Sequence, residues 1–78
     1  MSKFSERTKL LRTKNHKTLQ QVAFATDISV PTLWSYEHDK HSASLSAVII
    51  LADYYEVSLD YLVGRDKYVQ PKIHKPAK

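Results

Sequence analysis

The spacing of the apolar residues constrains the fold of this chain more than any other feature. Apolar positions recur every three or four residues and almost nowhere alternate with polar ones. This periodicity indicates helices rather than strands. The chain also has a single glycine, Gly64, which excludes the phosphate-cradling loops that need two or three glycines. We therefore expect an all-α fold without a glycine-rich nucleotide site.

Helix-start signals divide the chain into five expected helices. Thr18 followed by Gln21 forms a capping-box pattern, in which each side chain bonds to the backbone N–H of the other residue. Ser29 is an N-cap candidate with Pro31 in the turn after it, where a missing N–H does no harm. Gly64 suits the end of the last helix. The expected helices cover approximately residues 4–15, 18–27, 29–37, 44–55 and 58–63.

The size and composition of the chain exclude several classes of protein. A chain of 78 residues has room for one small core. It has no cysteine, which excludes disulfides, thiolate zinc sites and cysteine nucleophiles. No window holds the roughly 18 to 20 apolar residues that a membrane span needs, and the N-terminal residues are charged where a signal peptide is apolar. We expect a cytoplasmic protein with no cofactor, no metal, no membrane contact and no small-molecule substrate.

Charge is distributed unevenly along the chain, whose formal net charge is +4. Residues 1–17 and 65–78 are basic, whereas residues 18–64 carry six acidic groups and one basic group, Lys40. Basic ends favour a polyanionic partner. The alternative is that the C-terminal tail is simply solvated and disordered. We expect a folded domain over residues 1–64 and a basic, proline-containing tail over residues 65–78.

Residues 18–37 are organised as a helix, a turn of about four residues and a second helix. Ala23 is small where a crossing helix must approach closely, and Asp27 falls where the chain reverses and tolerates a left-handed conformation. Ile28 follows as an apolar plug, and Leu33 is the core position of the second of these helices. An ordinary helical hairpin has similar apolar positions, so the spacing favours a helix-turn-helix without requiring one.

Two long segments carry a family resemblance: FSERTKLLRTKNHKTLQQVAFATDISVPTLWSYEHDK and SLSAVIILADYYEVSLDYLVG. Over residues 4–64 the chain resembles the Xre/Cro-like helix-turn-helix family of bacterial and phage transcription regulators. The resemblance implies a five-helix, lambda-repressor-like DNA-binding domain with the helix-turn-helix at its second and third helices. It further implies a non-enzymatic, repressor-like regulator of phage or prophage descent that reads the major groove of double-stranded DNA with its third helix. In the family, the residues that match Arg12 and Glu37 form an ion pair between helices.

The chain departs from the family pattern at three positions. Asp27 stands where a turn glycine is usual, Leu19 where many members carry a phosphate-binding glutamine, and Ala43 where a proline often precedes the fourth helix. These departures bear on the phosphate contacts and not on the fold.

The resemblance implies that the outward face of the third helix contacts DNA bases, while Leu33, Tyr36 and Glu37 face inward. The candidates for base contacts are Ser29, Val30, Pro31, Trp34 and Ser35. None of them is Arg, Asn or Gln, the residues that contact bases bidentately. Readout would then depend on thymine methyl groups, sugars, a serine hydroxyl and DNA shape. The alternative for Trp34 is that it packs in the core against the fourth helix.

The two loops that flank the helix-turn-helix supply most of the candidate phosphate contacts. The candidates are Lys14, Lys17, Thr18, Gln20, Thr32, His38, Lys40 and His41. N–H groups at the start of the second helix would join them, because a helix N-terminus attracts anions. His38 and His41 could in principle share a metal ion, but no carboxylate or thiolate supports them, and we expect none.

The fourth helix has two apolar stripes, and the second predicts self-association. The inward stripe consists of Leu45, Val48, Leu51, Ala52 and Tyr55. The second stripe consists of Ala47, Ile50 and Tyr54. Because so small a domain cannot bury a helix all round, we expect a two-fold homodimer through the fourth and fifth helices. Its half-sites would lie about one DNA turn apart. The alternative is that the tail, with Tyr68, Val69 and Ile73, folds back over the stripe.

No constellation of residues supports an enzyme. Ser29, Ser44 and Ser58 are helix caps, and none lies in a G-x-S-x-G elbow. Asp53 and Glu56 resemble a solvated helix face rather than an acid–base pair. The alternative to a DNA-binding regulator is a small helical protein-interaction module, such as an antitoxin or an anti-repressor. The outward face of the third helix is apolar enough to serve either function.

Overall fold

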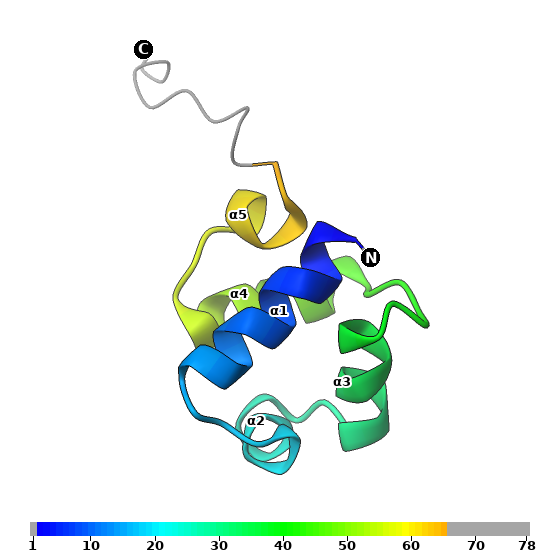
Figure 1. Ribbon diagram of the computed structural model, residues 1–78, viewed down its shortest axis with the longest axis vertical. Coiled ribbons are helices and arrows are strands. Elements are labelled where there is room, and N and C mark those ends of the chain that lie inside the picture. Colours follow the sequence, from blue (N-terminus) through cyan, green and yellow to red (C-terminus); the bar gives the residue numbers. More distant parts are fainter. Residues whose placement is uncertain (1, 66–78) are drawn as a thin grey trace.

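Five helices form the whole of the ordered fold in a computed structural model that describes residues 2–65 (Figure 1). Their bounds are α1 Lys3–Lys14, α2 Leu19–Thr26, α3 Val30–Glu37, α4 Leu45–Tyr55 and α5 Leu59–Val63. No strand occurs within residues 2–65, so the expected all-α, five-helix fold is confirmed. None of these helices is both long enough and apolar enough to span a bilayer. The predicted tail, apart from Arg65, lies outside the described residues, as do the alternatives that depend on it.

A serine or threonine side chain caps the start of every described helix and accepts a backbone N–H from its first turn. At α2 the capping box is complete, since Thr18 and Gln21 each bond to the backbone of the other. The chain reverses after α2 at Asp27, which is left-handed with φ of 61°. Gly64 ends α5 with φ of 84°. Each of these local predictions is confirmed because each depends on neighbours in sequence.

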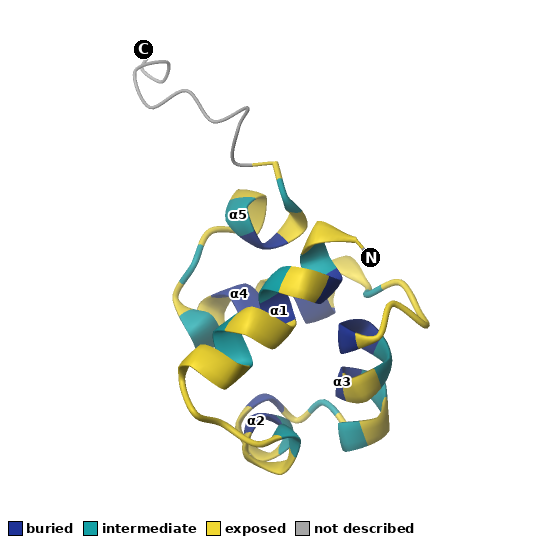
Figure 2. Ribbon diagram, viewed as in Figure 1, coloured by how far each residue is buried: buried dark blue, intermediate teal, exposed yellow. Residues whose placement is uncertain are grey.

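The helices pack around one small core (Figures 1 and 2). Helix α1 crosses in front of α4, with α3 beside it, α5 at one end and α2 at the other. Helix α2 packs against α3 and α4, which completes the helix-turn-helix. The fully buried apolar side chains are Val22, Leu33, Tyr36, Ala47, Val48, Leu51, Ala52 and Leu62. The core thus lies between α4 and the other four helices and holds α3 by one side only.

The inner side of α1 is polar, which the apolar spacing did not predict. Leu10 was expected among the inward apolar positions, but it is 53% exposed, whereas Ser5 and Thr8 are buried. The Ser5 hydroxyl donates a hydrogen bond of 2.7 Å to the carbonyl oxygen of Glu37. A buried hydroxyl is tolerated here because this bond satisfies it, and it fastens α1 to the end of α3.

The two stripes predicted on α4 are partly exchanged. Leu45 was expected to face inward but is 70% exposed, and Ala47, expected at a dimer interface, is 7% exposed and belongs to the core. The reason is geometric: the other helices cover the side of α4 that contains Ala47 as well as that of Val48 and Leu51. Leu45 is the first residue of α4 and lies outside that cover. Ala47 therefore cannot contribute to an interface between two copies.

Candidate nucleic-acid interface

Helix α3 is attached to the domain by one face. Leu33, Tyr36 and Glu37 are buried, and the Tyr36 ring meets the Phe4 ring of α1 edge-on, with centroids 5.7 Å apart. The predicted base-contact residues occupy the remaining surface. Val30 and Ser35 are half-buried and Ser29 and Pro31 are exposed, while Trp34 is 43% exposed. The α3 surface that faces solvent is therefore the one that the sequence assigned to DNA bases.

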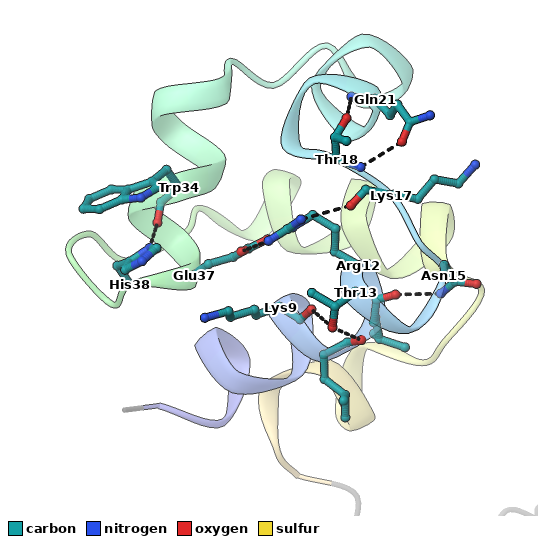
Figure 3. A network of polar contacts seen from close by, with 12 residues as sticks. Lys9, Arg12, Thr13, Asn15, Lys17, Thr18, Gln21, Trp34, Glu37 and His38 are labelled. Carbon is teal, nitrogen blue, oxygen red and sulfur yellow. Dashed lines mark hydrogen bonds and ion pairs between the residues drawn. The ribbon is translucent and has the colours of Figure 1, made fainter.

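A bidentate ion pair fixes the inner side of α3 to α1 (Figure 3). Arg12 Nε donates to Glu37 Oε2 over 2.7 Å, and Arg12 Nη2 donates to Glu37 Oε1 over 2.9 Å. The side chains are only 17% and 5% exposed. The hydrogen bond to Glu37 raises the pKa of Arg12 above its ordinary value, against the opposing effect of burial. Arg12 Nη1 also donates to the Lys17 carbonyl oxygen over 3.0 Å, so one guanidinium positions both α3 and the loop before α2.

Trp34 and His38 form a stacked pair on the exposed side of α3 (Figure 3). Their ring centroids lie 4.0 Å apart and the ring planes differ by 16°. His38 Nδ1 lies 2.9 Å from the Trp34 carbonyl oxygen. The core alternative for Trp34 does not hold, because the indole is half-exposed and leans on His38, which is itself exposed. His38, predicted as a phosphate contact, has its Nδ1 engaged within α3.

The hydroxyls at the starts of α2 and α3 are engaged in capping. Ser29 Oγ donates to Thr32 Oγ1 over 2.8 Å and accepts the Thr32 N–H. Thr18 Oγ1 accepts the Gln21 N–H, and the Thr18 N–H donates to Gln21 Oε1 over 2.8 Å. Gln20, one position along from Thr18, is exposed. A phosphate at the start of α2 would therefore meet Gln20 and the remaining first-turn N–H groups more readily than the Thr18 hydroxyl.

A surface hollow of about 380 Å³ lies beside α3 and joins two of the predicted sets. Its lining residues are Pro31, Thr32, Ser35, Tyr36, His41 and Ser42. Pro31 and Ser35 were predicted to contact bases, and Thr32 and His41 to contact phosphates. Ser42 was missed, because nothing in the sequence indicates that the α3–α4 loop turns back toward the first turns of α3.

The exposed lysines lie in two separate places around α3. Lys14 and Lys17 belong to the end of α1 and the loop before α2, and Lys40 belongs to the loop after α3. Lys17 lines a second hollow of about 340 Å³. The residues that line this hollow are Asn15, Lys17, Tyr54, Tyr55 and Glu56. Tyr54, predicted at a dimer interface, is thus beside a predicted phosphate contact.

Several exposed apolar side chains were not among the predicted site residues. Phe24 of α2 is 93% exposed. It lies two residues beyond the buried Val22, and a helical rotation of about 200° places it on the opposite side of α2. Ile49, Leu59 and Val63 are each between 38% and 40% exposed. Helical periodicity could have identified Phe24, whereas the other three depend on how α4 and α5 meet.

The fold and the exposed third helix define a small helix-turn-helix domain, and comparison with known proteins gives its family. A family model described as Helix-turn-helix matches residues 9–62, and the chain belongs to this family. It is similar to a Bacillus subtilis (strain 168) protein named "Uncharacterized HTH-type transcriptional regulator YobD". The two are 29% identical over 72 residues, which is 92% of this chain and 64% of that protein. The chain thus spans less than two thirds of the relative's length.

Proposed function

We propose that this protein is a repressor-like transcription regulator that binds double-stranded DNA sequence-specifically, with α3 in the major groove. One observation carries the proposal: α3 is fastened to the core by Leu33 and Glu37, while its opposite face is open to solvent. Lysines from the loops at both of its sides could meet the phosphates of the two strands. Family membership and the relative named as a transcriptional regulator support the same function.

The chemistry of the outward face limits how DNA sequence would be read. Pro31 and Trp34 offer apolar surface for thymine methyl groups and sugars, and Ser35 offers one hydroxyl. Residues that bind base edges bidentately are not present between Val30 and Glu37. Much of the specificity would then come from DNA shape and from the position of the backbone contacts.

A binding selection tests the proposed function. The full chain is used to select duplexes from a random-sequence library, and the strongest duplex is compared with a shuffled one by fluorescence anisotropy over a series of salt concentrations. We expect the selected duplex to bind at least about a hundredfold tighter, and both affinities to fall as salt rises. Equal, weak binding to both duplexes would contradict the proposal. Such a result would favour the protein-interaction module, for which the exposed ring of Phe24 offers a docking surface.

We also propose that the protein forms a homodimer through α4 and α5, by a face that differs from the one predicted. Leu45 and Ile49 lie one helical turn apart on α4, and Leu59 and Val63 lie one turn apart on α5. Val48 and Val63 line a common hollow, which places α5 on the Leu45 side of α4. This face is more apolar than isolated exposed residues would make it, and contact with a second copy would bury it.

Two substitutions on opposite flanks of α4 test the dimer. Leu45→Glu should weaken self-association by at least about tenfold, because a carboxylate would be buried in an apolar contact. Ile50→Glu is the matched control, since Ile50 is 40% exposed on the other flank. Sedimentation equilibrium measures both. Loss of the dimer with Ile50→Glu alone would show that the flank predicted from the sequence is the interface, and a monomeric unsubstituted chain would exclude both.

A further inference from the structure

The indole of Trp34 is held from one side by the imidazole of His38 (Figure 3). The two residues are four apart, which places them on neighbouring turns of one helix face. Besides the stacked rings, one carbonyl oxygen joins them: Trp34 O lies 2.9 Å from His38 Nδ1 and accepts the His38 backbone N–H over 3.0 Å. A carbonyl oxygen can only accept, so Nδ1 carries a hydrogen in this arrangement.

This bond determines what the other ring nitrogen can do. When Nδ1 carries the hydrogen of a neutral imidazole, Nε2 has a lone pair and can only accept. A DNA phosphate also only accepts, so neutral His38 cannot donate a hydrogen bond to it. The stacked ring nevertheless has a clear physical effect, because it covers one face of the indole and opposes rotation of the Trp34 side chain.

We propose that His38 is a positioning residue for Trp34 and does not contact phosphate. This inference rests on the proposed function, in which Trp34 packs against bases or sugars. An exposed tryptophan that is free to rotate loses side-chain entropy when it binds, and a tryptophan already held in one orientation loses less. The pair thus presents one defined face and edge of the indole to the groove.

Three substitutions of His38 separate positioning from phosphate contact. His38→Phe keeps an aromatic ring to stack on the indole but has no nitrogen. His38→Gln keeps a hydrogen-bond donor but has no ring, and His38→Ala has neither. Each variant is examined at about pH 8 for its melting temperature, for quenching of Trp34 by acrylamide without DNA, and for binding to the duplex selected by the unsubstituted chain. Trp34 is the only tryptophan of the chain, so its fluorescence is unambiguous.

We expect His38→Phe to bind within about twofold of the unsubstituted chain, and His38→Ala and His38→Gln to bind about fivefold more weakly with an unchanged salt slope. Quenching should increase in His38→Ala and His38→Gln but not in His38→Phe. Retained affinity in His38→Gln, with a lower salt slope in His38→Phe, would overturn the proposal in favour of a phosphate contact. Equal quenching in all four proteins would also overturn it. If the unsubstituted chain selects no duplex, the proposed function fails and this inference fails with it.

Discussion

The two faces of α3 differ in how completely their groups are engaged. On the inner face, Leu33 is buried in the core and Glu37 holds Arg12 by two hydrogen bonds. On the outer face, Pro31, Trp34 and Ser35 contact little beyond α3 itself and a shallow hollow. The difference indicates that stability and recognition are carried by different residues of the same eight-residue helix. Substitutions on one face should therefore change unfolding, and substitutions on the other should change binding.

The largest expected effect lies on the inner face. Glu37→Ala should lower the free energy of unfolding by about 3 kcal/mol, because the partly buried Arg12 guanidinium loses its partner. Arg12→Ala should have an effect of similar size. Urea unfolding followed by circular dichroism measures both. If both variants unfold like the unsubstituted chain, the inner face does not carry the stability that we assign to it.

The exposed ion pair of α5 provides the control for this measurement. Arg65 Nε and Asp60 Oδ1 are 3.8 Å apart, and the two side chains are 65% and 53% exposed. Asp60→Ala should therefore change the free energy of unfolding by less than about 1 kcal/mol. A loss as large as that of Glu37→Ala would mean that burial does not explain the difference between the two pairs.

The next largest effect lies on the outer face. Trp34→Ala should weaken binding to the selected duplex by more than about tenfold, weaken binding to a shuffled duplex much less, and leave the fold intact. In the free protein, emission of Trp34 should be red-shifted and accessible to quencher. Phe24→Ala is the matched control, since it removes an exposed ring from α2, and it should leave DNA binding unchanged. Melting of Trp34→Ala far below the unsubstituted chain would show that the two faces are not separate.

The lysines around α3 should have smaller and less specific effects. Neutralising Lys14, Lys17 or Lys40 should weaken binding to selected and shuffled duplexes alike, by a few fold each at moderate salt. The logarithmic salt slope should fall by about one unit for each lost contact. Anisotropy titrations over a salt series measure this. A lysine whose removal changes sequence preference but not the salt slope belongs to the base-reading surface instead.

The predictable part of the fold is the part with local causes. The capping box of Thr18 and Gln21 and the left-handed turn at Asp27 depend on residues close in sequence. The burial of Ser5 could not be predicted, because it depends on a carbonyl oxygen of α3 that is 32 positions away in sequence. The exchange of Leu45 and Ala47 has a similar cause: α4 is apolar nearly all round, and only the packing of its neighbours decides which flank is covered.

The candidate site could be predicted to the same extent. Helical periodicity indicates which residues of α3 face outward, and the position of Trp34 follows from that of Leu33. It does not indicate that His38 stacks on Trp34, because a spacing of four positions permits the contact without requiring it. Nor does it indicate that Ser42 lines a hollow with Pro31, since loop conformation has no periodic signal.

The smallest expected effect concerns Tyr55, which lies near the inner face of α3. Burial, and after it the negative charge of Glu37, raises the pKa of the Tyr55 phenol well above its ordinary value near 10. The folded protein therefore keeps this proton at pH values where the unfolded chain has lost it. Since the unfolded state then binds fewer protons, the free energy of unfolding should fall as the pH rises above about 10.

Tyr55→Phe should make this alkaline loss of stability shallower, because a phenylalanine has no proton to lose on unfolding. Urea unfolding between about pH 8 and pH 11 measures the slope. Tyr54→Phe is the matched control, since it removes the neighbouring hydroxyl from the same helix while the two rings can still meet edge to face. The slope should change less in Tyr54→Phe than in Tyr55→Phe. An unchanged slope in Tyr55→Phe would mean that the phenol is as well solvated in the folded protein as in the unfolded chain. The inner face of α3 would then exclude less water than its buried ion pair implies.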